Sequence, residues 1–119
     1  MKVFISADME GISGVYSAAA TERDHPDYPI ACRLMTGDVN AAVQGAVDAG
    51  AVEVWVRDAH GGANNILIED LHPRAHLIGG WNEVARMMDG INDSFAAAFL
   101  VGYHASSLTA AFVADRGTL

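Results

Sequence analysis

Near its N-terminus the sequence reads VFISADMEGISG, from Val3 to Gly14. The first three of these residues are β-branched or aromatic, and they predict a short buried strand that ends before the acid Asp8. A polar stretch with two prolines follows at 21–29, and apolar residues then recur at helical spacing from about Ile30 to Ala49. Gly50 is a suitable residue to end that helix. The first fifty residues therefore predict a strand, a loop and one long helix.

Further apolar runs continue this alternation of strands and helices. Val52–Val56, His76–Ile78 and Ala96–Val101 predict three more strands. Strands that alternate with helices pair in parallel, and such sheets are covered on both faces. We therefore expect an α/β fold with a mainly parallel sheet, in a single domain over residues 1–119 that looks like the first half of something larger. Shorter helices are predicted at Asn65–Leu71, Asn82–Met88 and Ser107–Ala114.

The composition argues against several classes of protein. The chain has 119 residues, of which 51% are hydrophobic, and a formal net charge of −8. This acidity disfavours nucleic acid and anionic membranes as partners. The longest apolar run, Phe95–Val101, is far shorter than the roughly 20 residues of a membrane-spanning helix. Cys32 is the single cysteine, so no internal disulfide can form. Asp8 comes too early for the core of a signal peptide, and we expect a cytoplasmic protein.

Polar side chains gather where the predicted strands end. Asp8 and Glu10 follow the first strand, His60 follows the second, and His104 follows the fourth. Because parallel strands all end at one edge of a sheet, these side chains can converge there, at the edge where α/β proteins bind ligands. Zinc accepts both carboxylate and imidazole ligands, and one carboxylate could bridge two ions. The alternative is that the acids are ordinary loop residues and that His60 caps a turn.

Other residues near these positions have simpler interpretations. Asp58 is placed to orient a metal ligand by hydrogen bonding to it. For Asn64 and Asn65, we favour capping of the next helix over hydrogen bonding to a substrate. Met87 is expected to fill the core, and Cys32 to be a small buried helix residue.

Four blocks of the sequence carry recognisable motifs. In chain order they are SADMEGISG at Ser6–Gly14, LMT and VNA within Leu34–Ala41, VWVRDAHG and NN within Val54–Asn65, and FLVGYHA at Phe99–Ala105. These blocks resemble, in the same order, the zinc-dependent D-aminopeptidases of the M55 metallopeptidase family. The resemblance extends over about residues 1–109 and covers less than half of a typical family member.

The resemblance implies a fold, an activity and a set of ligands. The fold would be a three-layer α/β/α domain that binds two zinc ions, with Asp8 as the bridging ligand and Glu10, His60 and His104 as further ligands. Family members release N-terminal D-amino acids from short peptides and amides, with water activated by the metal as the attacking group. They also form ring-like homo-oligomers, so the resemblance implies that this chain assembles with copies of itself.

Two departures from the family pattern concern the C-terminal part of the sequence. The family has a further carboxylate ligand downstream of the GYHA block, and the present sequence ends before reaching it. Asp115 stands where the family has a catalytic histidine, eleven residues after His104. A carboxylate cannot offer the same donor near neutral pH. We therefore expect an impaired hydrolase or, alternatively, a non-catalytic metal-binding or assembly subunit that retains part of the metal site.

Overall fold

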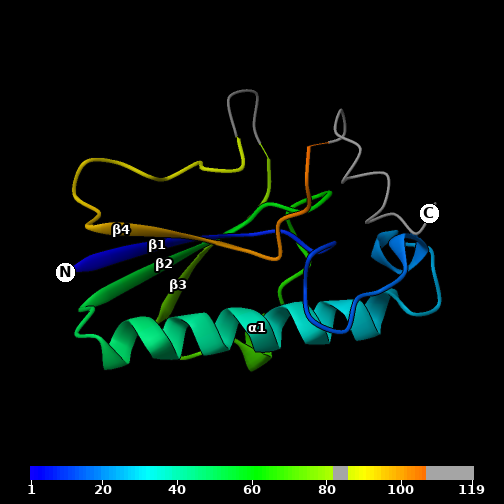
Figure 1. Cartoon of the computed structure of the whole chain (residues 1–119), viewed down its shortest axis with the longest axis horizontal. Helices are drawn as coiled ribbons and strands as arrows, with labels where there is room; N and C mark the ends of the chain where they lie inside the picture. The colour runs from blue at the N-terminus through cyan, green and yellow to red at the C-terminus, as the bar shows by residue number, and fades with distance from the viewer. Residues whose placement is uncertain (82–85, 107–119) are drawn as a thin grey trace.

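A computed structural model describes residues 1–81 and 86–106 of the chain. These residues form a sheet of four parallel strands, in the order β3-β2-β1-β4, with one long helix packed against it (Figure 1). The predicted α/β fold with a parallel sheet is therefore confirmed. The elements are β1 (Lys2–Ala7), α1 (Tyr28–Asp48), β2 (Glu53–Asp58), β3 (Ala75–Ile78) and β4 (Ala97–Val101).

The core lies between the sheet and α1. Val3 and Ile5 of β1 belong to the same buried cluster as Met35 and Val39 of α1, and each of these side chains is at most 1% exposed. Burying an aliphatic side chain of this size stabilises the fold by about 1.5–3 kcal/mol. The apolar stripe predicted for the helix is therefore the surface that holds α1 on the sheet.

Both ends of α1 follow from its sequence. The helix begins at Tyr28, two residues earlier than predicted, with Pro29 in its first turn. Proline is favoured there because its missing N–H has no acceptor within a helix. Gly50 has φ +102°, a conformation that glycine adopts without strain, and the chain leaves the helix at this point.

The opposite face of the sheet is covered by residues 86–96, which lie above it in Figure 1. Phe4 packs edge-to-face against Phe95, with ring centroids 5.3 Å apart. Ser6 Oγ donates to the backbone carbonyl of Met87 at 2.5 Å. Met87 itself is only partly buried and is not among the core residues, contrary to the prediction, because its side chain lines a pocket.

The segment between β2 and β3 contains less helix than predicted. Instead of a helix over Asn65–Leu71, a single 3-10 turn, η2 (Ile68–Asp70), is present. Asn40 of α1 accounts for the difference, because its Nδ2 donates to the carbonyl of Asp70 and its Oδ1 accepts from the N–H of His72, both at 2.7 Å. These bonds hold the backbone in an extended path beside α1.

The remaining helix predictions fall largely on residues that the structure does not describe. Ser107–Ala114 and residues 82–85 lie outside the described ranges, and residues 86–88 are not helical. Within 1–81 and 86–106, no helix has both the length and the apolar character needed to cross a membrane.

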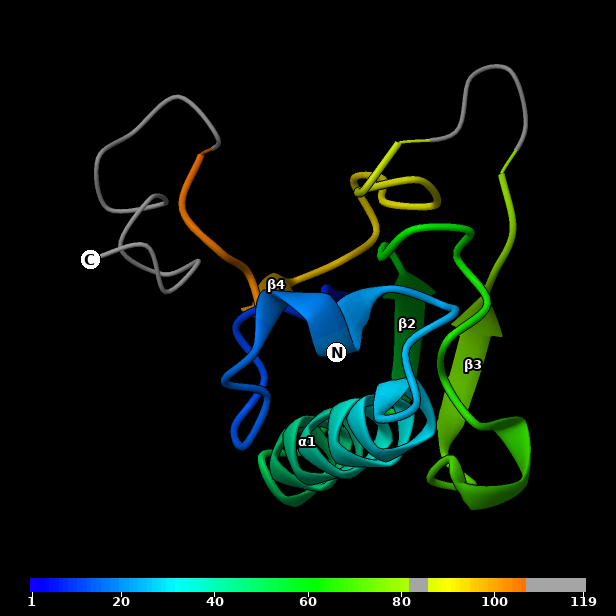
Figure 2. The same ribbon diagram turned by 90° about the vertical axis from the view of Figure 1, so that its right-hand side faces the viewer.

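The strand order reverses at β1, and this positions the candidate site. After β1 the chain adds β2 and β3 on one side, and it then returns to place β4 on the other side. Ligands of open α/β sheets bind at the carboxyl ends of the strands, where such a reversal separates the loops. Figure 2 views the molecule from this edge.

Candidate metal centre

Backbone hydrogen bonds join the loops after β1, β2 and β4 at the carboxyl end of β1. They run, from donor N–H to acceptor carbonyl, from Asp8 to Val101, from Ala59 to Ala7 and from Gly11 to Gly102, at 2.9, 2.8 and 2.7 Å. The ladders of the sheet therefore continue beyond the strands and bring the three loops side by side.

Two glycines allow this close approach. A Cβ atom at Gly11 would lie 2.5 Å from the carbonyl oxygen of Tyr103 and 2.8 Å from that of Gly102. Gly102 has φ +70°, and a Cβ atom there would overlap the carbonyl oxygen of Asp8. Any larger residue would push the loops after β1 and β4 apart, so these glycines keep His104 close to the acids.

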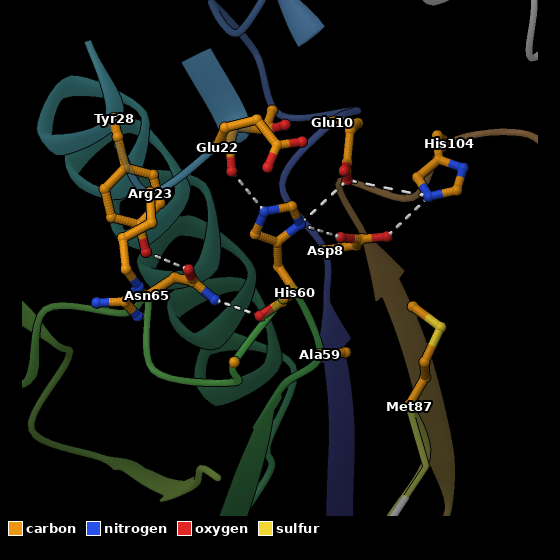
Figure 3. A pocket seen from close by; sticks show the side chains of 13 residues that line it. Asp8, Glu10, Glu22, Arg23, Tyr28, Ala59, His60, Asn65, Met87 and His104 are labelled. Carbon is orange, nitrogen blue, oxygen red and sulfur yellow. Dashed lines mark hydrogen bonds and ion pairs between the residues drawn. The ribbon is translucent and has the colours of Figure 1, made fainter. Parts of the chain in front are cut away.

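The structure brings together all four residues predicted from the strand ends (Figure 3). Nδ1 of His60 lies 3.0 Å from Oδ1 of Asp8 and 3.3 Å from Oε2 of Glu10. Nε2 of His104 lies 3.3 Å from Oδ2 of Asp8 and 3.9 Å from Oε2 of Glu10. Asp8, Glu10 and His104 offer ligand atoms that all lie within 4.8 Å of one another.

The charged groups of the cluster shift one another's pKa values. Burial raises the pKa of Asp8, and the neighbouring Glu10 raises it further. Burial would also raise the pKa of Glu10, but its contacts with His60 and Asp8 outweigh this and lower the pKa to about 2. Burial disfavours the His60 cation, yet the two carboxylates and a backbone carbonyl raise its pKa to about 10. The carboxylates therefore hold a positive charge between them, which in this form is a proton on His60.

The orientation of His60 is set by a backbone carbonyl. Nε2 of His60 lies 2.9 Å from the carbonyl oxygen of Thr21, the last residue of the 3-10 turn η1 (Ala18–Thr21). A carbonyl can only accept, so Nε2 carries a proton and Nδ1 is directed at Asp8 and Glu10. A hydrogen bond of this kind fixes the tautomer of a metal-binding histidine.

Asp58 orients His60 through its backbone and not through its imidazole, because Oδ1 of Asp58 accepts from the backbone N–H of His60 at 3.4 Å. Its Oδ2 accepts from the backbone N–H groups of Asn65 and Ile66 at 2.6 and 2.8 Å, and its Oδ1 accepts from Nδ2 of Asn65 at 2.8 Å. Nδ2 of Asn65 also donates to the backbone carbonyl of His60 at 2.6 Å. Asp58 therefore shapes the loop that carries His60.

The capping role predicted for Asn65 is wrong, because its side chain bonds to the loop after β2 and to α1 instead. The N-cap position of η2 is Leu67, and no side chain caps that turn. The side-chain amide of Asn65 instead joins Asp58 to His60, and its Oδ1 accepts a hydrogen bond from the hydroxyl of Tyr28. The buried amide of Asn65 therefore has hydrogen-bond partners for both its nitrogen and its oxygen.

The chemistry of the cluster fits zinc. Two carboxylates and two imidazoles provide oxygen and nitrogen donors of the kinds that zinc binds. Among the described residues, Oε2 of Glu10 is buried and makes no hydrogen bond of good geometry, although both imidazoles lie within 3.9 Å of it. A cation between Glu10 and the histidines would satisfy this oxygen. Asp115 lies outside the described residues.

A pocket of about 430 Å³ opens beside the cluster. Sequence reasoning found the acids and histidines of its wall but missed Thr21, whose contribution is a backbone carbonyl that any residue could supply. It also missed Met87, which was assigned to the core. The pocket is lined by Asp8, Glu10, Thr21, Glu22, Arg23, Tyr28, Ala59, His60, Gly61, Gly62, Asn65, Met87 and His104.

The fold and this cluster define a class: a parallel α/β protein with a carboxylate–histidine centre suited to a divalent metal at the point where the strand order reverses. Comparison with known families is more specific. The M55 peptidase family, described as D-aminopeptidase, matches residues 1–115. The chain belongs to this family.

Two comparisons show how much of a family member the chain represents. It is 38% identical over 109 residues to a D-aminopeptidase of Bacillus subtilis (strain 168), covering 92% of this chain and 40% of that protein. A solved structure described as the Zn-dependent D-aminopeptidase DppA from Bacillus subtilis, a self-compartmentalizing protease, matches with a TM-score of 0.88 and 38% identity. That match covers 92% of this chain and 40% of the other. The chain therefore spans two fifths of the length of these relatives.

Proposed function

We propose that this chain is a zinc-dependent D-aminopeptidase that releases N-terminal D-amino acids from short peptides or amides. The observation that carries the proposal is the convergence of Asp8, Glu10, His60 and His104 at the carboxyl edge of the sheet. Membership of the M55 family and similarity to a relative described as Zn-dependent support the same metal and the same reaction.

The four residues would hold the zinc. Asp8 contacts both histidines through different carboxylate oxygens, so it is placed to bridge if two ions bind. Bound zinc supplies Lewis-acid chemistry, since it polarises a carbonyl group and lowers the pKa of water. His60 enters this arrangement through Nδ1, because the carbonyl of Thr21 keeps the proton on Nε2. Metal binding would therefore displace the proton that His60 shares with the acids.

The other pocket residues would bind and orient the substrate. Glu22 lines the pocket and lies outside the metal-binding cluster, so its carboxylate is available to the ammonium group of an N-terminal amino acid. Met87 and Ala59 present apolar surface beside the cluster and would limit the water around the reacting bond. The pocket therefore offers both an acidic and an apolar environment next to the metal.

We also propose that the chain works as part of a homo-oligomer, ring-shaped as in its family. Support comes from the relative described as a self-compartmentalizing protease, of which this chain covers 40%. Asp115, which stands where the family resemblance implies a catalytic histidine, favours a second candidate function. In this alternative, the chain is a non-catalytic metal-binding or assembly subunit.

Zinc content and hydrolysis test these candidates together. We expect the purified chain, incubated with zinc and then desalted, to retain at least one equivalent and to hydrolyse D-alanyl p-nitroanilide but not the L-isomer. Chelation and His104→Ala should abolish the activity. His76→Ala is the matched control, because His76 is exposed on β3 and does not line the pocket.

Each outcome of this experiment separates the candidates. Stoichiometric zinc without hydrolysis favours the non-catalytic subunit. Failure to retain zinc contradicts both functions, and hydrolysis that survives both chelation and His104→Ala shows a contaminating enzyme.

A further inference from the structure

The pocket is asymmetric in charge. Figure 3 shows His104 at one end of the row of labelled side chains and Arg23 towards the other end, with His60 between them. Apart from the imidazoles, Arg23 is the only cationic side chain among the described residues that line the pocket. Three carboxylates share that lining, those of Asp8, Glu10 and Glu22. Once the cluster holds zinc, the charged groups left for a substrate are therefore Glu22 and Arg23.

The guanidinium of Arg23 is held by neutral partners. It donates a hydrogen bond through Nη2 to Oδ1 of Asn64, and its Cζ lies 5.7 Å from the ring centroid of Tyr28. None of the ion pairs between described residues includes Arg23, although Glu22 and Asp24 are its neighbours in the chain. Arginine has five N–H donors, and the one hydrogen bond to Asn64 leaves others for a ligand.

The loop after β2 is built to accommodate this arginine. A Cβ atom at Gly62 would lie 3.0 Å from Oδ1 of Asn64, the acceptor of the Arg23 hydrogen bond, so a side chain there would crowd that acceptor. The same wall is tied to the metal-binding cluster, because Tyr28 donates to Asn65 and Asn65 donates to the carbonyl of His60. The guanidinium therefore has a defined place relative to the cluster.

We propose that Arg23 binds the free C-terminal carboxylate of a short peptide whose scissile bond lies at the metal-binding cluster. The planar guanidinium matches a carboxylate with two parallel hydrogen bonds. This inference rests on the proposed function and narrows its substrates to short zwitterionic peptides, in preference to amides. The pocket of about 430 Å³ is of a size that suits small ligands, which agrees with a short peptide.

Calorimetric binding of two matched peptides tests the inference. D-alanylglycine and D-alanylglycinamide differ only in the charge at the C-terminus. We expect the chain, kept in chelator so that neither peptide is cleaved, to bind D-alanylglycine about tenfold to a hundredfold more tightly, the range expected for a hydrogen-bonded ion pair. Arg23→Gln should lower the affinity for D-alanylglycine by the same factor, so that the two peptides bind alike. Gly62→Ala should reduce the preference without any change of charge.

The control and the contrary results are equally specific. Arg33→Gln removes the same charge from an exposed position of α1 that does not line this pocket, and it should retain the preference. Equal affinities in the parent chain, or a preference that survives Arg23→Gln, would overturn the inference. Binding is measured in chelator, and the D-alanyl p-nitroanilide that tests the proposed function has no carboxylate. Loss of zinc or of hydrolysis therefore contradicts the proposed function alone.

Discussion

The contact between Gly102 and the loop after β1 makes Gly102→Ala a direct test of how the metal-binding cluster is held together. At φ +70°, an alanine is disfavoured by about 1–2 kcal/mol. Its Cβ would overlap the carbonyl oxygen of Asp8 and lie 2.5 Å from Cδ1 of Ile12. Because the Asp8 oxygen belongs to the backbone, the two loops must separate, and such overpacking adds about 1–3 kcal/mol. We expect the free energy of unfolding to fall by about 2–5 kcal/mol in total.

Urea unfolding with chelator present measures this loss, and competition with a chromophoric chelator measures the zinc affinity. We expect weaker zinc binding as well, because His104 follows Gly102 by two residues and would move away from Asp8. Gly50→Ala is the control, since Gly50 has φ +102° but its Cβ would meet nothing within 4 Å. It should lose only the backbone contribution and bind zinc normally. Equal losses in the two variants, or unchanged zinc affinity in Gly102→Ala, would refute the reasoning.

Two further predictions concern charge. In the presence of chelator, the free energy of unfolding should fall as the pH rises from about 6.5 to about 10, because the folded chain raises the pKa of His60 from 6.5 to about 10. Stability curves for His60→Ala should lack this decline, and a decline of equal size would exclude His60 as its source. Arg57 is fully buried, and none of its guanidinium nitrogens has a hydrogen-bond partner in the described parts of the chain, although its Cζ lies 4.4 Å from the ring centroid of Trp81. Arg57→Met should leave the thermal midpoint of unfolding unchanged or raise it, because an apolar side chain of similar length avoids the cost of burying a charge. Truncation to Ala should not have this effect. A lower midpoint for Arg57→Met would contradict the prediction.

The elements that the sequence predicts well are those in which a whole face is buried, so that apolar residues recur with the period of the strand or helix. Val3–Ile5 is apolar on both sides of the strand because α1 covers one face of the sheet and residues 86–96 cover the other. The stripe of α1 that contains Met35 and Val39 follows the helical period because a single face meets the sheet. In both cases the spacing of apolar residues in the sequence follows from which faces of the element are buried.

Predictions fail where a residue bonds to a distant part of the chain. Asn65 resembles a helix cap in sequence, but its Oδ1, the atom that would cap a helix, accepts instead from the hydroxyl of Tyr28 on α1. Thr21 supplies a carbonyl group, and no property of its side chain reveals that function. Asn40 likewise replaces helical bonds of the segment before β3 with its own. Hydrogen bonds of this kind cannot be predicted from the sequence, because they depend on how the fold places residues that are distant in the chain.

The position of β4 shows what the strand-end argument left undetermined. A shared carboxyl edge is necessary for the cluster, but it does not fix the order of the strands. Neighbouring strands lie about 4.8 Å apart, so β4 placed beyond β3 would stand three strands from β1, on the order of 14 Å away. His104 would then be out of reach of Asp8. In the observed order, β1 lies between β2 and β4, and Asp8 therefore meets His60 from one side and His104 from the other.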